Sequence, residues 1–144
     1  MGQKTGEMHG RDHVPGGADP IRLGEFEIKI VADTTVVAVG DAALIMCVPA
    51  DLDQAALITV ASFVTTVSTS GLVTVQIRNL SQGPVTMLST AVTIDVSEFT
   101  SYTAATAAVV NAANSKVKTG DLIAFDISAA GTGAKGLGAI VGFK

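Results

Sequence analysis

The sequence predicts an all-β protein, an antiparallel β-sandwich that follows an extended N-terminal arm. Three observations support this fold class: apolar and polar residues alternate at period 2, two longer segments are rich in β-branched residues, and turn residues recur at short intervals. The 144 residues, 48% of them hydrophobic, suffice for one domain with a core. We therefore expect an extended docking arm over residues 1–24 and a β-sandwich domain over residues 25–144.

The arm is expected to be extended because its composition opposes a helix or a central strand. Proline at two positions fixes φ and removes a backbone donor, and paired glycines open conformations that other residues avoid. With few apolar side chains to bury, such a segment takes its shape by docking on another surface. The residues expected to dock are His9, Arg11, Asp12, His13, Pro15, Gly16, Gly17, Asp19 and Pro20.

Period-2 alternation marks the strands of the body. In the first of them, Phe26, Ile28 and Ile30 alternate with charged residues. Two segments that follow this pattern are expected to be half-buried strands: 25–30 and 72–78. Two more alternate in the same way and are expected to be strands: 122–127 and 137–143. Two further segments are expected to be extended because β-branched Thr and Val are frequent in them: 57–68 and 85–96.

Turn residues separate these strands at short intervals, as in antiparallel sandwiches. Gly, Pro, Asp and Ser gather in six short stretches: 40–41, 49–51, 70–71, 81–84, 119–121 and 131–133. Residues 101–114 are harder to assign, since their alanines favour a helix while their Thr and Val residues oppose it. We expect a loop with one helical turn there.

Composition argues against several classes of partner. The net charge is −4 and nine basic residues are spread thinly, which disfavours nucleic acid. Aromatic residues make up only 4% of the chain and Trp is absent, so few side chains can stack on bases or sugars. The apolar runs are interrupted before they reach the ~18 residues of a membrane-spanning helix. We expect a soluble protein that binds neither nucleic acid nor membrane.

The only cysteine, Cys47, lies in the apolar run 44–48 and is expected to be buried. A single thiol excludes a disulfide within the chain and is typical of a protein made in a reducing compartment. The N-terminus also lacks the apolar stretch of a signal peptide. Synthesis in a cytoplasm is therefore expected.

Two motifs resemble binding sites but are better explained structurally. Residues 131–136 fit the dinucleotide pattern GxGxxG, yet only eight residues follow, too few for the helix and strand of such a site. A glycine-rich hairpin connection is expected instead. His9 and His13 have the spacing of metal ligands on a helix, but Gly10 and Pro15 oppose a helix. Hydrogen-bonded histidines are expected there, with no metal and no cofactor.

Catalytic groups are scarce in the body. Residues 23–144 contain no histidine, so a Ser–His or Cys–His site would have no base there. Three carboxylate pairs could in principle act as acid and base, and each is expected to be solvated at a turn or strand end: Asp51 with Asp53, Asp95 with Glu98, and Asp121 with Asp126. We therefore expect a protein that is not an enzyme.

Two segments resemble parts of known virion proteins. Residues 9–21, HGRDHVPGGADPI, are similar to the H-x-x-x-H-x-P-G-G-x-D-P motif near the start of many structural proteins of tailed bacteriophages. Residues 119–127 and 131–137 resemble the closing hairpin of a group of small β-sandwich virion proteins. The motif is fairly specific for phage virions but recurs in tail and fibre proteins as well as head proteins.

The resemblance implies a non-enzymatic structural protein with a jelly-roll-like sandwich that assembles as a homotrimer. A single compact domain with a short arm favours a capsid decoration, or cement, protein. Such a protein binds the major capsid protein on the outer capsid surface of the virion and reinforces the shell through its arm. The alternative is an adhesion or receptor-binding module of a tail fibre or head fibre.

Overall fold

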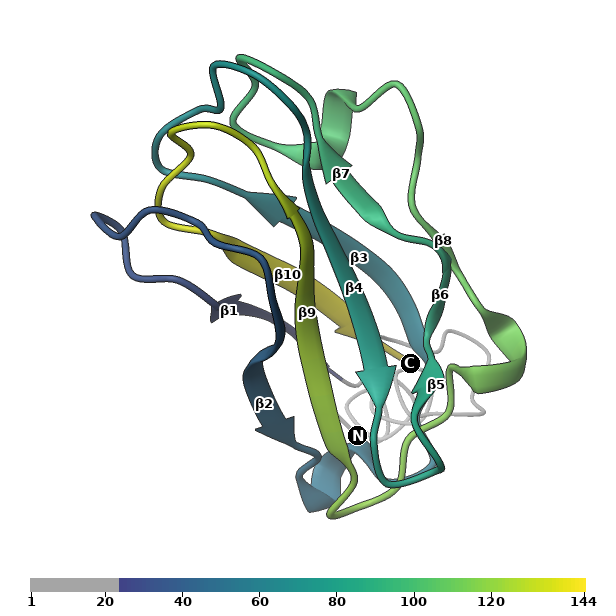
Figure 1. Ribbon diagram of the computed structural model, residues 1–144. Coiled ribbons are helices and arrows are strands. Elements are labelled where there is room, and N and C mark those ends of the chain that lie inside the picture. Colours follow the sequence, from purple (N-terminus) through teal and green to yellow (C-terminus); the bar gives the residue numbers. More distant parts are fainter. Residues whose placement is uncertain (1–23) are drawn as a thin grey trace, which may run out of the picture.

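A computed structural model describes residues 24–144, and that part of the chain consists of strands, loops and 3₁₀ turns (Figure 1). In chain order the elements are β1 (Gly24–Lys29), β2 (Gly40–Cys47), η1 (Ala50–Leu52), β3 (Leu57–Phe63), β4 (Val73–Asn79), β5 (Val85–Thr86), β6 (Leu88–Thr90), β7 (Val92–Ile94), η2 (Ser101–Thr103), β8 (Val109–Val110), η3 (Ala112–Asn114), β9 (Leu122–Ala130) and β10 (Gly138–Phe143). The all-β prediction is confirmed. Among these elements, no helix has the length and apolarity needed to cross a membrane.

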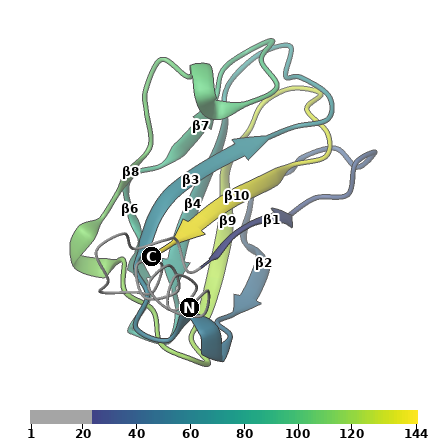
Figure 2. The same ribbon diagram turned by 180° about the vertical axis from the view of Figure 1, so that it is seen from behind.

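The strands form two main antiparallel sheets that face each other (Figures 1 and 2). One sheet has the order β1–β10–β3, and the other has the order β2–β9–β4–β5, with β7 also paired to β4. Strands β6 and β8 form a small additional sheet. This is the antiparallel sandwich that the sequence predicts. A jelly roll has eight strands in two Greek keys, and that finer arrangement stays a prediction.

Each main sheet has a central strand from the C-terminal part of the chain. Strand β10 lies between β1 and β3, with Gly24 of β1 opposite Phe143 and Lys29 opposite Gly138. Strand β9 lies between β2 and β4. The first and last strands are therefore neighbours, and the segment that precedes residue 24 joins the body beside its C-terminus.

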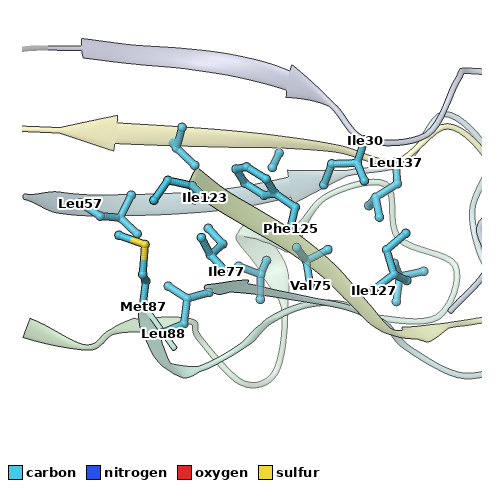
Figure 3. Packing of buried hydrophobic residues seen from close by; sticks show 14 of the residues in the cluster. Ile30, Leu57, Val75, Ile77, Met87, Leu88, Ile123, Phe125, Ile127 and Leu137 are labelled. Carbon is cyan, nitrogen blue, oxygen red and sulfur yellow. The ribbon is translucent and has the colours of Figure 1, made fainter. Parts of the chain in front are cut away.

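The core fills the space between the two sheets (Figure 3). Ile123, Phe125 and Ile127 of β9 are buried in it, which confirms the alternation expected for residues 122–127. From the opposite sheet come alternate residues of β10 and β1, and the ring of Phe26 stacks on that of Phe143 with 6.1 Å between centroids. Alternation at period 2 thus selects the buried face on both central strands.

Three regions differ in detail from the sequence prediction. The strand expected over 57–68 ends at Phe63, and the one expected over 85–96 is divided into β5, β6 and β7. Residues 101–114 contain two 3₁₀ turns, η2 and η3, on either side of the short strand β8. In all three regions, composition favours a type of structure but leaves the ends of the elements to tertiary contacts.

Strand β2 is absent from the sequence prediction. Residues 40–41 are expected to form a turn, but they begin this strand. Leu44 and Met46 of β2 are half-buried toward the core, whereas Ile45 and Cys47 are exposed. The prediction that Cys47 is buried is therefore wrong. Both faces of the strand carry apolar residues, so the period of 2 is hidden in the sequence.

Candidate functional site

The residues expected to form the docking arm lie outside the described residues, and their role stays a prediction: His9, Arg11, Asp12, His13, Pro15, Gly16, Gly17, Asp19 and Pro20. The same holds for the pairing of His9 with His13. In residues 24–144, no group of three or more His, Cys, Asp or Glu side chains is placed to hold a metal ion. The candidate site described below is therefore on the body.

The outer face of the β1–β10–β3 sheet carries a hollow between its strands and η2. The register places Glu27 of β1, Ile140 of β10 and Ala61 of β3 in one cross-strand row. The neighbours of Ile140 in the chain, Ala139 and Val141, are buried in the core. Because successive side chains of a strand point to opposite faces, this row lies on the outer face of the sheet.

The next row contains a phenylalanine ring that lies against the backbone of a glycine. Gly138 pairs with Phe63, and a Cβ atom at Gly138 would be only 2.3 Å from Cζ of that ring. The ammonium Nζ of Lys29 lies 4.8 Å from the centroid of the Phe63 ring and also donates a 2.6 Å hydrogen bond to Asp33. The ring is thus held between a bare backbone and a cation, a favourable arrangement for an aromatic side chain.

The opposite side of the hollow comes from the loop that contains η2. Two hydrogen bonds attach this loop to β3: Val64 N donates to Phe99 O, and Ser62 N donates to Ser101 Oγ, both at 2.9 Å. The attachment places Phe99 and Tyr102 beside the sheet with 57% and 72% of their surface exposed. Such exposure of large apolar side chains on one face marks a surface suited to binding.

These side chains line two open hollows at the surface that share Tyr102 and Ile140. The larger, of about 390 Å³, is lined by Glu27, Phe63, Val64, Phe99, Thr100, Tyr102 and Ile140. The smaller, of about 220 Å³, is lined by Glu25, Thr59, Val60, Ala61, Tyr102 and Ile140. We call the two together the aromatic hollow. Carboxylates are the only charged groups among their lining residues, so the aromatic hollow is apolar with an acidic border.

Asp126 was expected to be solvated at a strand end, and this prediction is wrong. It lies within β9 with 6% of its surface exposed. Arg78 of β4 donates to it from Nε and from Nη2, the latter at 2.9 Å, and Ala42 N donates at 2.7 Å. The bonds from Arg78 outweigh the effect of burial and lower the pKa of Asp126. The hydrogen bond to Asp126 in turn raises the pKa of Arg78.

Asp121 is also buried rather than solvated, with 7% of its surface exposed. Its Oδ2 accepts hydrogen bonds from Asn79 Nδ2 at 2.9 Å, Gln82 Nε2 at 2.7 Å and Lys118 N at 3.0 Å. Burial opposes ionisation of this carboxyl, but the three donors together lower its pKa. An acid that stays ionised in this way is poorly suited to donate a proton, so both carboxylates fit a structural role.

The other carboxylate pairs hold loops. Asp53 Oδ1 accepts from Thr119 N at 2.9 Å, and Asp51 is exposed in η1. Asp95 Oδ2 accepts from Ala105 N at 2.9 Å, and Glu98 accepts from the hydroxyl of Thr103. The last two bonds shape the loop that carries Tyr102. Their contribution to the aromatic hollow is therefore indirect.

The GxGxxG segment is a packed connection between the sheets. It joins β9 to β10, which belong to different sheets, so the prediction of a hairpin is wrong. A Cβ atom at Gly136 would lie 2.2 Å from Thr65 Oγ1 and 2.8 Å from the backbone of Asp33, and Gly136 has φ +66°. Glycine is required there by close packing rather than by a bound phosphate.

Sequence alone gives little warning of the aromatic hollow because its members are far apart in the chain. Phe63, Phe99, Tyr102 and Ile140 come together only through the pairing of β10 with β3 and the attachment of η2. A scan against protein-family models and a search of curated proteins gave no match to the chain. The function is therefore inferred from the geometry and from the motif in residues 9–21.

Proposed function

We propose that the chain is a non-enzymatic structural protein of a tailed-bacteriophage virion. In this proposal it is a decoration protein that binds the major capsid protein on the outer capsid surface as a homotrimer and reinforces the shell through its N-terminal arm. The observation that carries the proposal is the attachment of the motif-bearing segment to Gly24, at the start of the edge strand β1. Within residues 24–144 the buried apolar side chains form one core between the two sheets, and the proposal assigns the preceding segment to a partner.

The physical basis of the proposal is a division of labour between arm and body. A polar segment can exchange backbone hydrogen bonds with another protein while the sandwich keeps its own pairing. Arg11 and Asp12 would form charge-assisted contacts across that interface. Three arms in one trimer would bind at a high effective concentration once the first is docked, so weak single contacts would hold the protein on the particle.

The first test is the copy number of the chain in purified virions, measured by quantitative mass spectrometry against the major capsid protein. A copy number of the same order as the shell subunit is expected for decoration. A handful of copies per particle would contradict the proposal and indicate a tail or fibre protein. The oligomeric state of the isolated chain, measured by analytical ultracentrifugation, is expected to be a trimer.

The second test addresses the arm in the full chain. The double variant Arg11→Ala/Asp12→Ala should detach from purified particles at lower salt than the wild type, measured by sedimentation of the particles. The matched control is Lys116→Ala/Asp51→Ala, which removes one charge of each sign from exposed positions of the body. Equal retention of all three proteins would contradict the role of the arm.

One observation favours a second candidate, an adhesion module of a tail fibre or head fibre. The aromatic hollow gathers three of the six aromatic residues of the chain at one surface, which offsets the low aromatic content that disfavours glycan binding. This candidate predicts that the isolated protein binds host cells and that Tyr102→Ala reduces this binding. Decoration predicts binding to capsids that lack the protein, and no binding to host cells.

A further inference from the structure

The aromatic hollow combines exposed rings with a carboxylate. Phe63, Phe99 and Tyr102 line the larger of its two parts, and Glu27 is the only charged residue in that lining. Glu27 is exposed, and its carboxylate has no ion-pair partner within residues 24–144. Ring faces and a carboxylate both carry negative potential. A cation that enters the hollow is therefore attracted by all of them.

The body already holds one cation against an aromatic ring on this face. The ammonium Nζ of Lys29 lies 4.8 Å from the centroid of the Phe63 ring. This ammonium is also paired with Asp33 at 2.6 Å, and Lys29 belongs to the lining of neither hollow. The two other rings have no such contact within residues 24–144. Glu27 and these two rings thus form a cation site that the body does not fill itself.

The two hollows together have the length of a short extended peptide. They share Tyr102 and Ile140, and their ends along β3 are marked by Thr59 and Phe63. These two residues are four positions apart, which is about 14 Å at about 3.4 Å per residue. Four extended residues of a ligand span the same distance. A free organic cation would occupy only part of this length, so the shape favours a peptide segment.

We propose that the aromatic hollow binds an extended segment of a partner protein that presents an arginine beside apolar side chains. The guanidinium stacks on Phe99 and Tyr102 and pairs with Glu27, and an apolar neighbour contacts Ile140. Arginine suits this site better than lysine because its planar group stacks on rings and is weakly hydrated. The proposal goes beyond the proposed function, since it gives the body a contact of its own that does not involve the arm.

The chain supplies its own probe for this contact. Tyr102 is the only tyrosine, and the chain has no tryptophan, so tyrosine fluorescence reports on the hollow. We would titrate the full chain with the acetylated tripeptide amide Leu-Arg-Leu and with the same peptide carrying citrulline, which has the shape of arginine without its charge. The expected result is a saturable change with the arginine peptide and binding at least about threefold weaker with the citrulline peptide.

Variants of the full chain test the two parts of the site. Glu27→Gln should weaken binding of the arginine peptide about threefold and leave the citrulline peptide unchanged. Phe99→Ala should weaken binding of the arginine peptide by a similar factor, because it removes one of the stacking rings. The matched control is Asp51→Asn, which removes an exposed carboxylate of η1 outside both hollows and should bind like the wild type. Far-UV circular dichroism should show an unchanged fold in all three variants.

Several outcomes would overturn the proposal. One is equal affinity for the arginine and citrulline peptides, and another is no response of Tyr102 to either peptide. Binding of arginine amide alone, as tight as that of the tripeptide, would also overturn it, because the occupant would then be a free cation and not a protein segment. Retention on virions is a separate measurement, so failure of this proposal leaves the proposed function intact.

Discussion

The two outer faces of the sandwich differ in how their central strands are covered. On the β2–β9–β4 face, the outward residues of β9 include Ala124, which is completely buried, and Asp126, which is bonded to Arg78. On the β1–β10–β3 face, the outward residues of β10 are Gly138, Ile140 and Gly142. One face is filled by side chains that satisfy each other. On the other, the Phe63 ring lies against Gly138, and Ile140 lines both hollows beside it.

The largest effect should come from the filled face. Arg78→Ala leaves the Asp126 carboxylate buried without its cation, and removal of one partner of a buried pair costs about 3 kcal/mol. Lys29→Ala, on the hollowed face, breaks an exposed pair and should cost only about 0.5 kcal/mol. Urea unfolding of both variants measures the difference. Equal losses of unfolding free energy in the two variants would contradict the difference between the two faces.

The next largest effect should be a loss of stability in acid, which also arises on the filled face. The folded-state pKa values of Asp126 and Asp121 lie below the value of about 3.9 of an unfolded aspartate. Their stabilisation is therefore fully present above about pH 4 and is lost as the pH falls through the folded-state values. We expect the free energy of unfolding to be nearly constant from pH 6 to about pH 4 and to fall below about pH 4, by less than in Arg78→Ala. Asp126→Asn should make this fall smaller. A pH profile of the variant that runs parallel to that of the wild type would show that Asp126 does not cause the loss of stability in acid.

A methyl group on β10 should reshape the hollowed face at modest cost. In Gly138→Ala, the new Cβ atom displaces the Phe63 ring and its contact with Lys29, a loss of about 1 kcal/mol. Gly40→Ala is the control, since a Cβ atom there meets no atom within 4 Å. Urea unfolding gives the stability, and the ring-current shift of the Lys29 methylene protons in NMR spectra gives the position of the ring. An unchanged shift in Gly138→Ala would show that the ring does not lie against this glycine.

The smallest stability effect should come from the hollow itself. Tyr102 is mostly exposed, and Tyr102→Ala should change the free energy of unfolding by less than about 0.5 kcal/mol. Thermal unfolding measures this change. Phe125→Ala serves as the reference variant and should cost about 3 kcal/mol, because that ring is buried in the core. A loss above about 1 kcal/mol for Tyr102→Ala would mean that the side chain supports the fold rather than a binding surface.

The sequence was informative where one face of a strand is apolar and the other polar. The alternation in residues 25–30 predicted β1 correctly, because burial there follows a single periodic pattern. The alternation in residues 122–127 also predicted the core-facing side of β9, although its outward residues Ala124 and Asp126 are buried as well. Strand β2 was missed since both of its faces carry apolar residues, and Cys47 was placed on the wrong face as a result. Local pattern cannot choose between two apolar faces; only the pairing of β2 with β9 does so.

The candidate site was harder to predict than the fold for a related reason. Asp126 resembles a solvated carboxylate in sequence, and its partner Arg78 lies 48 residues away on β4. Phe63 and Ile140 likewise meet only through the register of β3 and β10. Low aromatic content was a sound argument against stacking surfaces on average. The fold nevertheless gathers half of the aromatic side chains of the chain at one place.

The pairing of the first and last strands has a consequence for protein engineering. Gly24 lies directly opposite Phe143, so residues 24–144 enter and leave the sandwich at adjacent points. A body of this kind can be inserted into a surface loop of a host protein with short linkers, or circularly permuted by joining its ends. A cargo fused after Lys144 would emerge beside the origin of residues 1–23. Such a fusion would compete for space with whatever that segment binds.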